Sequence, residues 1–153
     1  EDHMTTTFPE VRVKRYMEVR GADGGPWGRL CALPALWVGL LYDSAALNEA
    51  EALVRDWSFD EIQRAHIDVA KGGFKTILGG RAVGDIARDA VRIAKGGLQR
   101  RAVAGTPDAD ECGFLDTLQE LVDACRTPAE ELLDAFESRW QGNIDPLFKE
   151  YAY

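Results

Sequence analysis

The sequence predicts a mainly α-helical fold with one or two β-strands near its N-terminal end. Residues 11–20 alternate apolar and polar side chains with a period of two, which is typical of a strand with one buried and one polar face. From about residue 30 onward, apolar residues recur at helical spacing and are preceded by helix-capping patterns. We therefore expect a strand and loop segment over residues 1–29 and a helical region over residues 30–153.

Composition limits the classes of protein to consider. The chain has 153 residues, 18 Lys and Arg against 26 Asp and Glu, and a formal net charge of −8. This length can bury a core without disulfides, and the acidity argues against a general nucleic-acid partner. No apolar run reaches the ~18 residues of a membrane span, so we expect no membrane partner. Three cysteines without a CxxC pair indicate neither a zinc site nor a disulfide framework, and the expected setting is the cytoplasm.

The predicted strand is locally basic. Residues 11–20 hold four basic side chains and one acidic one, which suits a small anion such as a phosphate or carboxylate. Arg15 is the exception on the apolar side of the alternation, and the glycine-rich segment 21–26 ends the strand. A lone strand leaves its backbone groups without partners. Residues 5–9 could supply a short neighbour; otherwise the partners lie in another chain or a missing segment.

Helices are expected along the rest of the chain. The apolar segment 30–42 reads as a helix buried on most sides with Pro34 in its first turn, followed by a helix over 44–56. Ser58 and Glu61 form a capping-box pattern that opens a helix to about residue 70, and residues 71–80 are expected to be irregular.

The C-terminal half continues this pattern. Residues 81–100 are expected to form an amphipathic helix whose last turn Gly96 and Gly97 weaken, and 104–111 an acidic linker. Another helix is expected over 114–125, and Thr127 with Glu130 is a second capping box for a helix to about Trp140. The aromatic tail 142–153 is expected to dock onto the body.

Several stretches of this chain resemble the plant-type glutamate–cysteine ligases, which many bacteria also carry. The stretches are Thr5–Arg12, Arg15–Trp27, Cys31–Asp43, Thr127–Glu130 and Phe148–Tyr153. The resemblance covers essentially the whole chain, and its first forty residues are the most specific part.

The resemblance implies a fold and an activity. Family members are considerably longer, so this chain looks like their C-terminal third, the helical end of an α+β fold similar to glutamine synthetase. They use ATP and Mg²⁺ to join the side-chain carboxylate of glutamate to the amine of cysteine through a γ-glutamyl phosphate, the first step of glutathione biosynthesis. The missing N-terminal part would supply the neighbours of the orphan strand, residues 1–29 would hold an active-site loop, and the chain alone would be inactive.

The resemblance also suggests roles for individual residues. The Glu-x-Arg pair of related ligases places Glu18 on a metal ion and Arg20 near the nucleotide phosphates, as a catalytic and cofactor-binding group. Arg12 lies on the same face of the strand and is a candidate for binding a substrate carboxylate. The plain alternatives are a solvated ion pair for Glu18 and Arg20 and a structural salt bridge for Arg12.

The remaining candidates carry stronger structural alternatives. Thr5 and Thr6 could contact a substrate carboxylate or simply form a turn, and Trp27 could wall the cysteine pocket or only pack. Cys31 lies in a stretch that matches redox-sensitive plant members, although a buried apolar thiol at the start of the helix is the better explanation within this chain. Two other functions stay open: a non-catalytic helical module that pairs through an exposed strand edge, and an autonomous nucleotide-binding protein, for which one metal carboxylate is too few.

Overall fold

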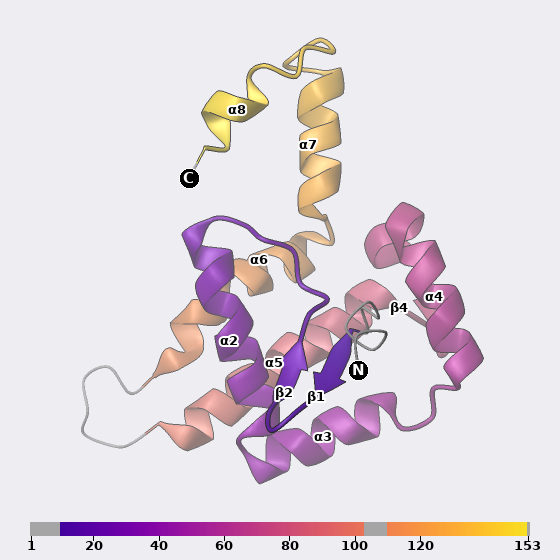
Figure 1. Ribbon diagram of the computed structural model, residues 1–153, viewed down its shortest axis with the longest axis vertical. Helices are drawn as coiled ribbons and strands as arrows, with labels where there is room; N and C mark the ends of the chain where they lie inside the picture. The colour runs from indigo at the N-terminus through magenta and orange to yellow at the C-terminus, as the bar shows by residue number, and fades with distance from the viewer. Residues whose placement is uncertain (1–9, 103–109, 153) are drawn as a thin grey trace.

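The computed structural model describes residues 10–102 and 110–152 (Figure 1). Most of them are helical, and two short antiparallel strand pairs make up the sheet structure of this part. The prediction of a mainly α-helical chain with strands near its start is confirmed. Thr5 and Thr6 lie outside the described residues.

The predicted single strand is a β-hairpin. Strand β1 (Val11–Val13) pairs antiparallel with β2 (Met17–Val19), and Val11 lies opposite Val19. Residues 14–16 form the turn, so the expectation of one strand over 11–20 is wrong. The alternation did not reveal the turn, because the sequence numbers of residues paired across the hairpin differ by an even number. Odd-numbered residues therefore lie on one face of the hairpin, as they would in a single strand. Arg15, the exception in the pattern, is an exposed turn residue.

The centre of the body is a close crossing of α2 (Trp27–Leu41) and α5 (Val83–Arg101). A Cβ on Gly97 would lie 1.9 Å from the carbonyl oxygen of Gly39, and one on Gly39 would lie 2.3 Å from that of Ala94. Because glycine has no Cβ, these two residues allow the backbones of α2 and α5 to approach more closely than any other residue type would permit. Gly97 was expected only to weaken its helix, whereas it makes this crossing possible.

Helix α2 begins earlier than predicted. Pro26 is its N-cap and its carbonyl accepts from the backbone N–H groups of Arg29 and Leu30, so Pro34 lies inside the helix and not in its first turn. The burial expectation holds for one side of the helix. Around the crossing is a buried core, which consists of Ala32, Ala35, Leu40, Ala46, Ile93, Ala94, Leu98, Cys112 and Leu115.

The next helices follow the capping signals. Helix α3 (Ser44–Val54) is capped by Asp43, whose carboxylate accepts from the Ala46 N–H at 2.8 Å. Helix α4 (Phe59–Gly72) begins with the predicted capping box of Ser58 and Glu61. The irregular stretch that follows holds the 3₁₀ turn η1 (Gly73–Lys75) and a tight hairpin of β3 (Ile77–Leu78) and β4 (Arg81–Ala82).

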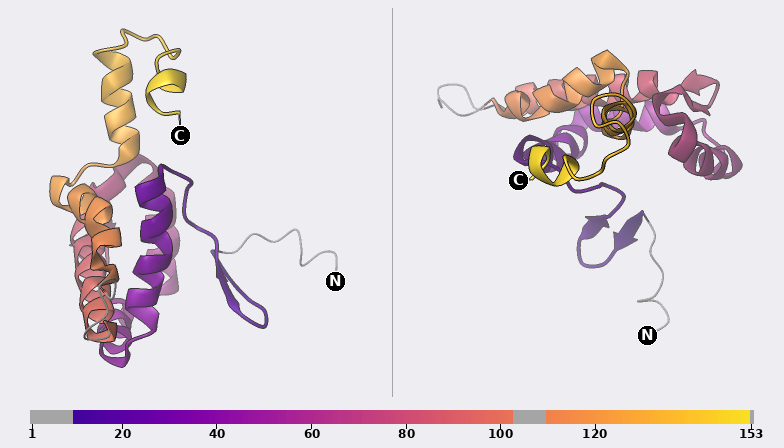
Figure 2. Two further views of the ribbon diagram at one scale, coloured as in Figure 1. Left: turned by 90° about the vertical axis from the view of Figure 1, so that its left-hand side faces the viewer. Right: turned by 90° about the horizontal axis from the view of Figure 1, so that it is seen from above.

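An arm extends from the body at the C-terminal end. The 3₁₀ turn η2 (Glu111–Leu115) and α6 (Asp116–Ala124) pack on α2 and α5, whereas α7 (Pro128–Glu137) and α8 (Leu147–Glu150) project away (Figures 1 and 2). Helix α7 has the predicted Thr127 capping box but ends three residues short of Trp140.

The tail docks, but onto α7. The indole N–H of Trp140 donates to Glu150 at 3.0 Å, and its ring meets Tyr151 edge-on at 6.2 Å between centroids.

Within the described ranges, no single helix is long and apolar enough to cross a bilayer, and α2 with α3 meets that length and composition test only as a pair bent by 93°.

Candidate functional site

The β1–β2 hairpin places the predicted charged residues on one face. Arg12 lies directly opposite Glu18 in the register. The ladder continues one step further, because the Arg20 N–H donates to the Glu10 carbonyl at 2.9 Å. Glu10, Arg12, Glu18 and Arg20 therefore share a face by alternation, and we call these four residues the hairpin polar face. In one continuous strand Arg12 and Glu18 would be about 20 Å apart, so the turn is what brings them together.

Glu18 is the centre of this face electrostatically. Its Oε2 lies 3.3 Å from Nε of Arg12 and 3.5 Å from Nζ of Lys14. Glu18 Oε2 and Arg12 Nε are inaccessible to solvent, yet neither is in a hydrogen bond with the described residues, so their ion pair is close but poorly aligned. A half-exposed ion pair of this kind stabilises a fold little. The Glu18 carboxylate can, however, leave Arg12 and Lys14 for a bound cation, and the two basic side chains can then pair with an anionic ligand.

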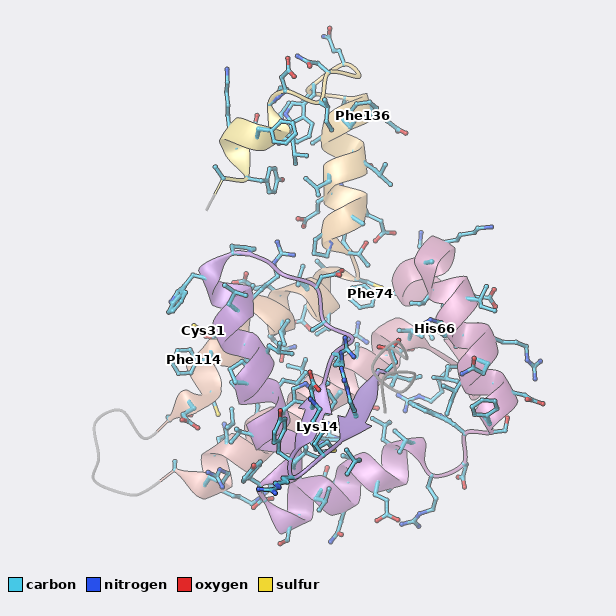
Figure 3. All side chains as sticks on the ribbon, viewed as in Figure 1. Lys14, Cys31, His66, Phe74, Phe114 and Phe136 are labelled. Atoms are coloured by element: carbon cyan, nitrogen blue, oxygen red, sulfur yellow. The ribbon has the colours of Figure 1, made fainter. Side chains whose placement is uncertain are left out.

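The hairpin stands off from the helices. Figure 2 shows it projecting from the helical body, and its strands pack chiefly against each other. His66 of α4 reaches toward it, with Nδ1 3.7 Å from Glu10 Oε1 (Figure 3). On the face opposite the polar one, Val13 is 80% exposed and Met17 53% exposed. The hairpin thus carries an apolar face that the described part of the chain leaves uncovered.

Trp27 is the other predicted site residue in the described part of the chain, and it is not joined to this face. Trp27 is 78% exposed at the first turn of α2, and no hydrogen bond or ion pair among the described residues links it to the hairpin. Sequence reasoning gave no role to Lys14 or Glu10. Lys14 could have been found from its i,i+4 spacing to Glu18 combined with a hairpin turn between them. Glu10 could be found only from the register.

Metal-binding capacity in the described residues is limited. No group of three or more His, Cys, Asp or Glu side chains lies close enough together there to hold a metal ion. Cys31, Cys112 and Cys125 are all free thiols. Cys31 is half-buried and lines a small cavity of about 230 Å³ with Phe114 (Figure 3). Burial raises the pKa of Cys112 to about 11, which keeps that thiol protonated.

Comparison with known proteins adds independent information. The family model described as Glutamate-cysteine ligase family 2 (GCS2) matches residues 1–150. The chloroplastic glutamate–cysteine ligases of Solanum lycopersicum and Arabidopsis thaliana are each 46% identical over all 153 residues, which cover 28% of each relative. Ligase A of Oryza sativa subsp. indica is 45% identical, and the match covers 30% of it. The chain therefore spans less than a third of the length of these relatives.

The expected cytoplasmic location is wrong on this comparison. All of the relatives just described carry names that place them in the chloroplast. The number and spacing of cysteines reflect the redox conditions of a compartment and contain no targeting signal. Import into an organelle depends instead on a separate targeting segment. The composition of these 153 residues could not have distinguished the two compartments.

Proposed function

Because the chain belongs to glutamate–cysteine ligase family 2, we propose that it forms the C-terminal part of an enzyme that joins the side-chain carboxylate of glutamate to the amine of cysteine. The reaction uses ATP and Mg²⁺, proceeds through a γ-glutamyl phosphate and yields γ-glutamylcysteine, the first product on the route to glutathione. The observation that supports this proposal best is the hairpin polar face, where Arg12 and Glu18 lie opposite each other with Arg20 beside them.

Phosphoryl transfer to a carboxylate requires this kind of face. Several negative charges must be brought together, and metal ions with cationic donors neutralise them. The Arg20 guanidinium can hold phosphate oxygens with a bidentate fork and stabilise the transferring group. Arg12 can hold the carboxylate of an amino-acid substrate in the same way. Both roles use side chains that the hairpin fixes on one side of a rigid strand pair.

Glu18 fits a magnesium ion as one ligand, not as a complete site. Magnesium takes one or two protein carboxylates and completes its shell with phosphate oxygens and water. Glu18 offers an inaccessible Oε2 that makes no hydrogen bond with the described residues, and no group of three or more potential metal ligands forms around it there. When bound, the ion would neutralise charge on the phosphates. Glu18 would then exchange its contacts with Arg12 and Lys14 for the metal, which frees both cations for substrate.

The rest of the active site would come from outside the described part of the chain. Val13 and Met17 present an apolar face that the described residues leave exposed, and a two-stranded hairpin alone is marginally stable. A larger sheet that covers this face would also complete the polar one. We therefore expect the chain alone to be inactive, with activity restored when the N-terminal part of the enzyme is added.

One observation favours a second candidate function. Each of β1 and β2 pairs only with the other among the described residues, so each outer edge presents unpaired backbone groups. Such edges recruit strands from other chains. A non-catalytic helical module that binds a partner through this edge would have the same fold, and it would not need Glu18.

The experiment that separates these functions is complementation. The chain is mixed with ATP, Mg²⁺, glutamate and cysteine, with and without the N-terminal remainder, and phosphate and dipeptide are measured. We expect turnover only in the complemented mixture. Turnover by the chain alone, or none in a mixture shown to associate, would contradict the proposal.

Glu18→Gln tests the metal role in the complemented enzyme. We expect at least about a hundredfold loss of kcat and a higher Mg²⁺ requirement, because an amide is a poor ligand for a hard cation. Glu51→Gln is the matched control. Glu51 is an exposed residue of α3 that pairs with Arg55, and its substitution should leave kcat and the Mg²⁺ requirement unchanged. A wild-type rate for Glu18→Gln at low Mg²⁺ would assign Glu18 to a structural ion pair.

A further inference from the structure

Two cavities meet near the N-terminal ends of α2 and α7, away from the hairpin. One, of about 540 Å³, lies between the loop before α2 and the α7–α8 arm, and the other, of about 340 Å³, lies between α2 and α6. Arg29, Pro128 and Glu131 line both, so they form one continuous cleft. No residue of β1 or β2 lines it, which separates it from the hairpin polar face.

The cleft holds opposite charges that do not neutralise each other. Arg29 lies in the first turn of α2 and is half-buried, and Glu131 lies in the first turn of α7. Neither side chain is in an ion pair within 4.0 Å or a hydrogen bond with any other residue of the described part. Glu120 of α6 adds a second carboxylate to the smaller cavity. The Arg29 guanidinium is therefore available to pair with the anionic group of a ligand.

One wall of the cleft is apolar and held in place. Leu132, Leu147 and Phe148 line the larger cavity, and Phe148 is 72% exposed. Helix α8 is fastened to the end of α7 because Glu150 contacts Arg139 at 2.7 Å and accepts from the Trp140 indole at 3.0 Å. The apolar wall within the arm is therefore formed before any ligand arrives, which lowers the cost of binding.

We propose that this cleft binds a small zwitterion with an apolar side chain, namely a free α-amino acid. Its carboxylate pairs with Arg29, its ammonium pairs with Glu131, and its side chain packs on Leu132 and Phe148. A simple anion can pair with Arg29 alone and a simple cation with Glu131 or Glu120 alone, whereas a zwitterion pairs with charges of both signs. The proposal concerns binding outside the hairpin and does not depend on the proposed ligase activity.

The first test uses the unaltered chain and three probes of equal size. Nuclear magnetic resonance titration with L-leucine should give saturable shifts at the amides of Gly24, Leu132 and Phe148. Leucinamide lacks the carboxylate and 4-methylpentanoate lacks the ammonium, so each should bind about tenfold more weakly or worse. Equal affinity for all three probes, no saturation by ~10 mM leucine, or shifts centred on residues 11–20 would overturn the proposal.

Crossed variants assign the two charged contacts. Arg29→Gln should remove the preference for leucine over leucinamide, and Glu131→Gln should remove the preference for leucine over 4-methylpentanoate. Arg92→Gln, an exposed arginine on α5 that pairs with Glu49 and Asp89, is the control and should keep both preferences. Retention of both preferences by Arg29→Gln and Glu131→Gln would contradict the assignment. Because no readout involves catalysis, this result cannot be confused with failure of the ligase proposal.

Discussion

The crossing of α2 and α5 and the β1–β2 hairpin differ in how closely they are packed. At the crossing the two backbones are in contact, whereas in the hairpin a valine side chain is largely exposed to solvent. A Cβ at Gly97 would lie 1.9 Å from the Gly39 carbonyl oxygen, whereas Val13 is 80% exposed. The crossing is complete within the described residues. The hairpin has one half-buried face of charged groups and one apolar face that the described residues leave exposed. Stability therefore resides mainly in the helical body, whereas the groups suited to chemistry lie on a strand pair outside it.

This division has a physical reason. Close packing leaves no room for a ligand, and charged groups buried there would lose hydration without compensation. A hairpin that projects from a rigid body can present Arg12, Glu18 and Arg20 at little cost to the fold. The consequence is that substitutions in the two regions should affect different measurements.

The largest effect is expected for Gly97→Ala. The added methyl group would collide with backbone, which cannot rotate away, so we expect α2 and α5 to separate at a cost of roughly 3 kcal/mol or more. The adjacent Gly96→Ala is the matched control, because its Cβ would meet only the flexible end of Arg100, at 3.2 Å. That change should be neutral or stabilise by up to about 1 kcal/mol through helix propensity. Urea unfolding followed by circular dichroism measures both, and similar losses for the two variants would refute the crossing.

A second comparison places one truncation in each region. Leu98 is among the largest fully buried side chains, so Leu98→Ala should destabilise by about 2–5 kcal/mol. Val13→Ala should change the free energy of unfolding of this chain by less than about 0.5 kcal/mol. In the complemented enzyme, however, Val13→Ala should weaken association with the N-terminal part, which analytical ultracentrifugation can measure. A large stability loss from Val13→Ala in the isolated chain would show that its face is already covered.

The same contrast explains which features the sequence could predict. Ser58 with Glu61 and Thr127 with Glu130 were recognised because a capping box is a local pattern whose partners are three residues apart. The role of Gly97 could not be, because it depends on Gly39, a residue far away in the chain. Helix propensity alone made Gly97 look like a weak point.

The placement of Arg12, Glu18 and Arg20 on one face was predicted correctly, although the expected single strand was wrong. In this hairpin the sequence numbers of paired residues differ by an even number, so even-numbered residues share a face as they would in one continuous strand. The turn itself was missed because residues 14–16 include no Gly, Pro, Asn or Asp. Only Arg15, out of place on the apolar side, indicated it. The contact of Lys14 with Glu18 and the cleft at Arg29 depend on tertiary structure and had no sequence signal.

Acid should weaken the fold by protonating the carboxylates that cap its helices. The hydrogen bond from Arg100 lowers the pKa of Asp43, the Ser58 hydroxyl lowers that of Glu61, and the Thr127 backbone N–H lowers that of Glu130. A carboxylate with a lowered folded pKa stabilises the fold above its unfolded pKa, and this contribution disappears as the pH falls through the folded pKa.

We therefore expect the contribution of these carboxylates to Tm to be flat from pH 7 to about 5.5 and to decline steeply below about pH 4. Ser58→Ala should lower Tm by a few degrees at pH 7 and reduce the acid-dependent decline, because Glu61 loses its partner. Differential scanning calorimetry across this range provides the measurement. An unchanged acid slope in Ser58→Ala would remove the capping box from this explanation.

The smallest effect is a difference in reactivity that leaves stability unchanged. Cys112 belongs to the core, donates to the Lys95 carbonyl at 3.3 Å and has a pKa of about 11, whereas Cys125 is exposed at the end of α6. At pH 8 only about a thousandth of Cys112 is thiolate, and burial adds a second barrier. Iodoacetamide should therefore alkylate Cys125 first, with Cys112 modified only as fast as the body opens. Mass spectrometry of timed digests separates the sites, and the urea-unfolded chain, in which Cys112 loses its burial, is the control. Comparable rates for both thiols in the folded chain would mean that the body around α2 and α5 is as open as the hairpin.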